Sequence, residues 1–384
     1  MRKIVIVCLL TLQAFSSCYR LPDLHLYDVD NPGLAFPIVE VNLDTYWDYD
    51  ITLGMDYNWR SEWFYGWDEE DRRIFGELEY EDPNNFHVRR YYTGEVPYGP
   101  RLHKRIAYIM GRSFRAPYDW GFWDILVWND VNTLDGVQSI RFDEKSSFDE
   151  DIMAYTNSTM YRTRYHAPRY ENSFYEPEQL FSVCEKGIEI NKNLDGFVFE
   201  EESNMWIKRL KMYLEPITYI YLPQIILHNN RGRITLVPGS ANLSGMARST
   251  SLNTGITGDD AIAVNFKMRL KNDKEFKNGE RVDIVGGRLM TFGMCGQNAN
   301  RVTRAEDGKD TKRHYLDVQM QFMNGMDSTF VFDVTNQVRE RYKGGVITVE
   351  LDMDTVPMPK RPGGSGFDAV VKDVEDGGTH IFDM

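Results

Sequence analysis

Hydrophobic and polar residues alternate with a period of two along most of the second half of the chain. Between residues 261 and 270 one face carries Ile262, Val264, Phe266, Met268 and Leu270. Such alternation indicates strands with one buried and one wet face, which favours antiparallel sandwiches over parallel α/β folds. The same pattern predicts further strands at residues 316–322, 330–334 and 347–353.

Turn residues separate these strands, and helical patterns are scarce. Asn324-Gly325 predicts the turn of a hairpin that runs from Met320 to Val334. The best helical candidates are residues 178–186 and a short turn at residues 336–342. The sequence therefore predicts an all-β protein.

The first half of the chain differs in composition. Val39, Val41 and Leu43 begin a strand, but seven of the eight tryptophans then fall between Trp47 and Trp128. Ordinary alternation resumes after Trp206. Because the chain is long for one core, we expect two domains, residues 39–203 and 204–384, divided after the acidic stretch at residues 200–202.

The N-terminus has the pattern of an export signal. Two basic residues precede an apolar run from Ile4 to Leu12, and Ser16-Ser17-Cys18 follows. The run is too short to cross a hydrocarbon core of about 30 Å. Residues 1–17 are predicted to be a signal peptide, Cys18 the site of lipid attachment, and residues 18–38 a linker. The alternative is an ordinary cleaved signal with an incidental cysteine.

Charge argues against nucleic acid as a partner. Removing Arg2 and Lys3 with the signal leaves 42 basic against 58 acidic residues, a net charge of −16. Such a surface repels phosphate backbones and anionic headgroups. The two cysteines of the body, Cys184 and Cys295, are compatible with a disulfide in an exported protein or with two buried thiols.

No constellation for catalysis emerges from the motifs. The seven histidines lack the spacing of a zinc site, and no serine lies in a nucleophile elbow. The acidic run at residues 68–71 lacks a calcium-loop pattern, which favours a solvated face. We therefore predict no catalytic residue, cofactor or metal, and no enzymatic role.

The tryptophan-rich region has two interpretations. Exposed aromatic rings stack on sugars, so the region is compatible with a glycan-binding platform. Aromatic side chains also bury about 150–250 Å² each, which favours core packing for most of them. In the strand expected at residues 63–67, Trp63, Tyr65 and Trp67 share one side and are the candidates for ligand binding.

Several segments resemble a family of Bacteroidales lipoproteins that is similar to fimbrillin-like anchoring and accessory subunits of fimbriae. The segments that carry the resemblance are residues 17–20, 39–44, 242–247, 288–293 followed by Cys295, 332–338 and 366–371. The resemblance implies two tandem transthyretin-like β-sandwich domains, a palmitate-bearing N-terminus in the outer membrane at the cell surface, and fimbrillin-like subunits as partners. The alternative is a surface lipoprotein that binds glycans or a host ligand.

Two smaller expectations accompany this resemblance. Residues 367–384 are expected to form an edge strand near a site of subunit assembly, because an open sheet edge can accept a strand from a neighbour. Asp327-Ser328-Thr329 and Asp354-Thr355-Val356 resemble the O-glycosylation sites of exported Bacteroidales proteins, with Ser328 and Thr355 as the acceptors. Chance matches to so short a motif are the alternative.

Overall fold

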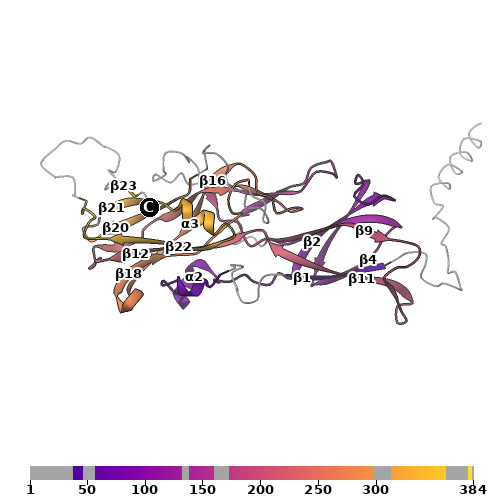
Figure 1. Ribbon diagram of the computed structural model, residues 1–384, viewed down its shortest axis with the longest axis horizontal. Helices are drawn as coiled ribbons and strands as arrows, with labels where there is room; N and C mark the ends of the chain where they lie inside the picture. Colours follow the sequence, from indigo (N-terminus) through magenta and orange to yellow (C-terminus); the bar gives the residue numbers. More distant parts are fainter. Residues whose placement is uncertain are drawn as a thin grey trace, which may run out of the picture.

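The computed structural model describes residues 38–45, 57–131, 138–159, 173–296, 313–359 and 379–382. Within these ranges the protein is all-β, as predicted, with helices confined to short turns. Figure 1 shows two β-rich bodies arranged along the long axis. Among the residues described, no helix is long and apolar enough to cross a bilayer. Cys18 lies outside the described residues.

The first body is a sheet that folds over its own core. Its strand order is β3-β2-β5-β9-β11-β1-β4, with β10 paired to β11. Side chains from both ends of this sheet, such as Val41 of β1 and Val127 of β5, meet in one cluster. The strands are β1 (Ile38–Thr45), β2 (Asn85–Gly94), β3 (His103–Met110), β4 (Ser113–Pro117), β5 (Gly121–Asn129), β9 (Phe181–Ile190), β10 (Phe197–Glu200) and β11 (Met205–Pro216).

The second body is a sandwich of two sheets. One sheet has the order β17-β18-β12-β19 with β22 paired to β12, and the other β23-β21-β20-β14-β16-β8 with β13 paired to β20. An aliphatic and phenylalanine-rich core lies between them. The first sheet comprises β12 (Tyr219–His228), β17 (Arg269–Glu275), β18 (Arg281–Gly286), β19 (Leu289–Thr291) and β22 (Gly345–Asp352). The second comprises β8 (Ser173–Tyr175), β13 (Ile234–Leu236), β14 (Ser240–Ala247), β16 (Ala261–Lys267), β20 (Tyr315–Phe322), β21 (Asp327–Asp333) and β23 (Thr379–Phe382).

A three-stranded sheet covers part of the first body. It consists of β6 (Ile140–Asp143), β7 (Met153–Thr156) and β15 (Ser249–Ser251) in the order β15-β7-β6. Its side chains share a core with Leu126 and Trp128 of β5. Cys184 and Cys295 pack against this cluster without a disulfide between them. The pairing that the sequence left open is therefore not formed.

Most strand predictions are confirmed. The alternating segment at 261–270 becomes β16 and β17, and the predicted hairpin is β20 and β21, which pair antiparallel around the turn at Gly325. The short helix near residue 336 is α3 (Thr335–Glu340). The helix expected at residues 178–186 is wrong, because that segment is β9, which pairs with β5 along most of its length.

Strand pairing also bears on how the chain divides. β11 begins at Met205, just after the expected division near residue 203, but it pairs with β1 and β9 of the first body. Glu200 of the acidic stretch lies in β10 and binds Arg115 of β4. The boundary near residue 203 and the transthyretin-like topology stay predictions. Four strand pairs run parallel within these mainly antiparallel sandwiches.

Candidate functional site: an aromatic strap and a sheet edge

Residues 57–80, which we call the aromatic strap, leave the first body and lie across the second. The strap contains a 3-10 turn, η2 (Trp59–Ser61), and the helix α2 (Glu69–Phe75). Figure 1 places α2 beside β18 and β22, far from the other strands of the N-terminal half. Buried strap residues Trp59, Trp63 and Tyr65 share a cluster with the outer face of the β12 sheet.

Hydrogen bonds between two tyrosine hydroxyls and main-chain groups of the second body hold both ends of the strap. The main-chain N–H of Val346 donates to the Tyr57 hydroxyl at 2.7 Å. At the other end the Tyr80 hydroxyl donates to the carbonyl of Thr218 at 2.5 Å. Burial raises the pKa of Tyr80 well above its usual range, so this hydroxyl stays a donor.

Gln224, in the centre of β12, fastens the middle of the strap. Its Oε1 accepts from the main-chain N–H groups of Phe64 and Tyr65 at 3.0 and 3.2 Å. Its Nε2 donates to the carbonyl of Glu62 and to the hydroxyl of Thr348. The side chain is fully buried and all of its hydrogen-bonding capacity is used. Gln224 therefore specifies where the strap lies.

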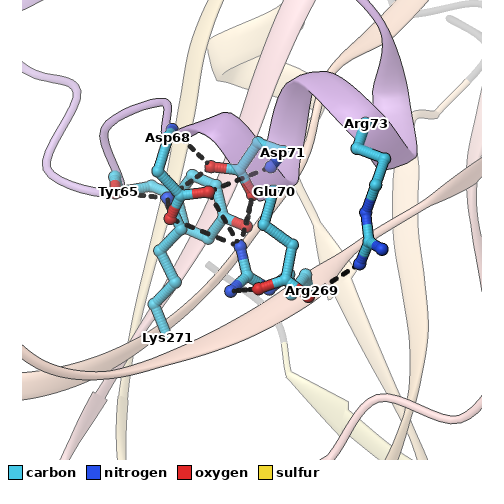
Figure 2. Close-up of polar contacts among 7 residues, drawn as sticks. All are labelled: Tyr65, Asp68, Glu70, Asp71, Arg73, Arg269 and Lys271. Atoms are coloured by element: carbon cyan, nitrogen blue, oxygen red, sulfur yellow. Dashed lines mark hydrogen bonds and ion pairs between the residues drawn. The ribbon is translucent and has the colours of Figure 1, made fainter.

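A cluster of charges fixes the strap beyond Gln224 (Figure 2). The carboxylate of Asp71, which is completely buried, receives hydrogen bonds from Tyr65, Arg269 and Lys271. Asp68 lies 2.9 Å from the Lys271 ammonium, and this ammonium lies 4.0 Å from the centroid of the Tyr65 ring. Asp68 and Asp71 also form the capping box of α2. Each charge in the cluster has an oppositely charged partner, so the cluster holds together two segments that are far apart in the sequence.

Two groups of this cluster, Tyr65 and Asp68, have strongly shifted pKa values. Burial, reinforced by the neighbouring Asp71 carboxylate, raises the pKa of Tyr65 far above its usual range. Partial burial opposes ionisation of Asp68, but the hydrogen bond from Lys271 outweighs it and holds the pKa of Asp68 well below its usual range. Tyr65 therefore stays a donor and Asp68 stays an anion.

Close packing completes the strap. A Cβ atom added at Gly286 of β18 would lie 2.5 Å from the Tyr65 ring, so only glycine lets the ring lie against this strand. The Trp63 and Tyr65 rings contact each other with centroids 5.4 Å apart. This geometry assigns the tryptophan-rich segment to packing.

The ligand-binding role expected for Trp63, Tyr65 and Trp67 does not fit their environment. Tyr65 is fully buried, Trp63 is 9% exposed, and Trp67 is half-buried against Phe75. Residues 63–67 follow the 3-10 turn η2 as irregular chain and do not form a strand. Gln224 binds their main chain, and Gly286 leaves room for the Tyr65 ring. Of the seven tryptophans in the described ranges, four are buried and three, Trp67, Trp120 and Trp206, are partly exposed, which supports core packing for most of the cluster. The solvated face expected at residues 68–71 is wrong for Asp71, which Lys271 and Arg269 bury.

The C-terminal edge of the second body is the other candidate site. Strand β23 pairs parallel with β21, from Thr329 opposite Thr379 to Phe332 opposite Phe382. β23 is the end strand of its sheet, so the chain supplies its own last strand at this edge. An edge strand at the C-terminal end of the sequence was expected, and its parallel direction was not.

The two candidate glycosylation acceptors lie in different environments. Ser328 is fully buried within β21, where its hydroxyl is out of reach of a modifying enzyme in the folded chain. Thr355 is exposed in a turn after β22 and donates to the carbonyl of Asp352. Of the two, only Thr355 has an environment that suits modification of the folded protein.

Across the described ranges, no three His, Cys, Asp or Glu side chains are arranged to bind a metal ion. His314, which is buried, donates from Nδ1–H to the Ser244 carbonyl, and burial lowers its pKa to about 4.

No protein-family model matches the sequence, and no curated protein matches it. The structure is similar to a candidate adhesin from Bacteroides ovatus, with 17% identity, a TM-score of 0.46, and 88% of this chain and 97% of that one covered. It is also similar to the fimbrial anchor protein Mfa2 (9% identity, TM-score 0.39, 82% and 90% covered) and to the tip fimbrial protein Mfa3 (6%, 0.31, 77% and 81%), both from Porphyromonas gingivalis. They are a candidate adhesin, a fimbrial anchor protein and a fimbrial tip protein, the kinds of protein to which the sequence resemblance pointed. Identities and scores of this size assign no function, which has to be argued from the residues of this chain.

Proposed function

We propose that this chain is a fimbrial assembly or adhesion subunit, anchored to the outer membrane through a lipid on Cys18. The observation that carries the proposal is β23, a strand from the end of the chain that completes a sheet edge. Such a strand is held mainly by main-chain hydrogen bonds to one neighbour, β21. An element of this kind can be contributed by the same chain or by another subunit, and main-chain pairing supports affinity in both cases.

The surroundings of this edge support the proposal. β21 is continuous with the sandwich core through Phe330 and Phe332, so a strand added at its edge extends a rigid sheet. Its register with β20 is fixed along seven residue pairs. A strand pairing there meets an edge whose position is already determined, which lowers the entropy cost of association.

The test is affinity purification of the native protein, gently solubilised from its own outer membrane, with the co-purifying chains identified by mass spectrometry. We expect fimbrillin-like subunits in constant ratio. Deleting residues 367–384 should abolish their recovery without changing the unfolding of the first body. A Cys18→Ser control should move the protein out of the membrane fraction while keeping its partners.

Two outcomes would contradict the proposal. Recovery of the intact chain alone would remove the assembly role. Recovery of the same subunits with the deleted chain would show that residues 367–384 are not the contact, and the assembly site would then lie elsewhere.

A further inference from the structure

Exposed apolar side chains are concentrated in one short stretch of the first body. Of the twelve large hydrophobic residues that are exposed in the described ranges, six fall between residues 96 and 110. Apolar surface gathered in this way marks an interaction site more often than scattered single residues do. The six are Val96, Tyr98, Leu102, Ile106, Tyr108 and Met110.

The centre of this stretch is β3, an end strand of its sheet. β2 pairs with β3 along its whole length, and no strand in the described ranges pairs with its other side. From Ile106 onward every second residue of β3 is exposed: Ile106 by 60%, Tyr108 by 51% and Met110 by 81%. Edge strands usually carry charges, prolines or bulges that prevent pairing, and the exposed face of β3 lacks these from Ile106 onward.

The side chains of this face are held in place before any partner arrives. The Tyr108 hydroxyl donates to Asp130 at 2.8 Å, and the Tyr108 ring contacts His87 edge-on at 5.1 Å. Asp130 in turn lies 3.1 Å from His87 Nε2. A ring that is already fixed loses little rotamer entropy on binding.

The charges beside β3 are neutralised locally. Lys104 pairs with Glu144 and Arg105 with Asp119. The chain as a whole has a net charge of −14, which opposes contact between two copies over most of its surface. The row of Ile106, Tyr108 and Met110 carries no charge of its own and has one carboxylate, Asp130, beside it, so repulsion between two identical rows is smaller than over most of the surface.

We propose that β3 pairs antiparallel with β3 of a second copy of this chain, around a two-fold axis beside Ala107. In this register Ile106 lies opposite Tyr108 of the partner subunit, an aromatic and β-branched pair of the kind that stabilises sheets. Lys104 lies opposite Met110 of the partner subunit, so the two lysines do not face each other. The contact is isologous and closes as a dimer. It does not involve β23 and is therefore separate from the assembly contact proposed above.

Sedimentation equilibrium tests this dimer. The full chain is used with Cys18→Ser in every sample, so that lipid does not drive association. We expect a concentration-dependent dimer, and Ile106→Lys should weaken it at least tenfold, because it removes the apolar contact between Ile106 and Tyr108 of the partner subunit at both symmetry-related positions and adds two like charges near the axis. Val198→Lys is the matched control: Val198 is 58% exposed on β10 of the same sheet, and its substitution should leave the dimer unchanged.

A disulfide cross-link tests the proposed register between the two β3 strands directly. Ala107→Cys places two thiols opposite each other at the axis, within the usual reach of a disulfide for directly opposed residues. Mild oxidation should then give a reducible dimer, and the same substitution at Ala116 of β4 should not. A wild-type chain that stays monomeric at high concentration would overturn the proposal. Equal weakening by Ile106→Lys and Val198→Lys would overturn it as well.

Discussion

Two stretches of the N-terminal half, the aromatic strap at residues 57–80 and the apolar stretch at residues 96–110, end in opposite environments. The strap is the richer in tryptophan, yet its rings are buried against the second body. The stretch around β3 contains no tryptophan, and its apolar side chains face solvent. Aromatic composition therefore does not identify the exposed surface of this molecule. An apolar side chain is buried where another part of the chain has a surface that packs against it, and it stays exposed where no such surface exists.

The matching face for the strap is built from polar groups as much as from apolar ones. Gln224 and Lys271 are buried on the second body. Without the strap, Lys271 would lose Asp68 and Asp71, and Gln224 would lose its hydrogen bonds to the strap main chain and keep the one to Thr348. A buried unpaired charge costs far more than a lost apolar contact. The strap is thus specified by side chains, whereas β3 offers mainly a backbone edge and a row of apolar side chains.

Removing the Asp71 carboxylate should break the strap and give the largest effect. Asp71→Ala leaves Lys271 buried with only Asp68 as an anionic partner and removes half of the capping box. We expect the free energy of unfolding to fall by about 3–5 kcal/mol, the usual cost of breaking a buried pair. Urea unfolding measures the loss, and hydrogen exchange at the Phe64 and Tyr65 amides should accelerate.

Glu69→Ala is the matched control for Asp71→Ala. Glu69 lies in the first turn of the same helix, but it is exposed. Its substitution should change the free energy of unfolding by less than about 0.5 kcal/mol. Equal effects at the two positions would show that the strap is held by its apolar rings and not by its charges.

Local patterning was sufficient for much of the fold and insufficient for the strap. Alternation identifies a strand wherever one face is buried, and the hairpin at Gly325 follows from turn chemistry. The segment that begins at Glu178 has helix-forming residues, but pairing of β9 with β5 overrides that preference. Asp71 and Lys271 are 200 residues apart, and no local signal connects them. The exposed row on β3 is visible as alternation, but its exposure depends on the absence of a neighbouring strand.

The strap and the sheets should contribute differently to the pH dependence of the free energy of unfolding. The carboxylate of Asp68 in the strap stays ionised to low pH, whereas burial raises the pKa of Asp317 in β20 from 3.8 to about 7. The folded chain therefore holds a proton on Asp317 that the unfolded chain releases, and this contribution to stability is lost as the pH rises from about 4 to about 7. His314 acts in the opposite direction, because its folded pKa of about 4 lies below its unfolded 6.5.

Asp317→Asn isolates these contributions. The amide keeps an oxygen for the hydrogen bond from Asn242 and has no proton to lose. We expect the variant to be more stable than wild type at pH 8, by roughly 1–3 kcal/mol. Between pH 4 and 6.5 its stability should fall less steeply with rising pH than that of the unsubstituted chain, because one of the two carboxyls whose pKa burial raises, Asp317 and Glu176, has been removed. Chemical unfolding at a series of pH values measures both slopes. The exposed Asp354→Asn is the control, and an unchanged slope in Asp317→Asn would mean that this carboxyl is ionised in the folded chain.

The smallest effect should come from the apolar stretch itself. Met110→Ala removes a side chain that is 81% exposed, so the free energy of unfolding should change by less than about 0.5 kcal/mol. Met290→Ala makes the same chemical change beneath the strap, where Met290 is 3% exposed, and should cost about 2–5 kcal/mol. Both are measured by urea unfolding at low protein concentration, where β3 is unpaired. A large loss for Met110→Ala would show that β3 is already covered within one chain, and the contrast between the two stretches would then disappear.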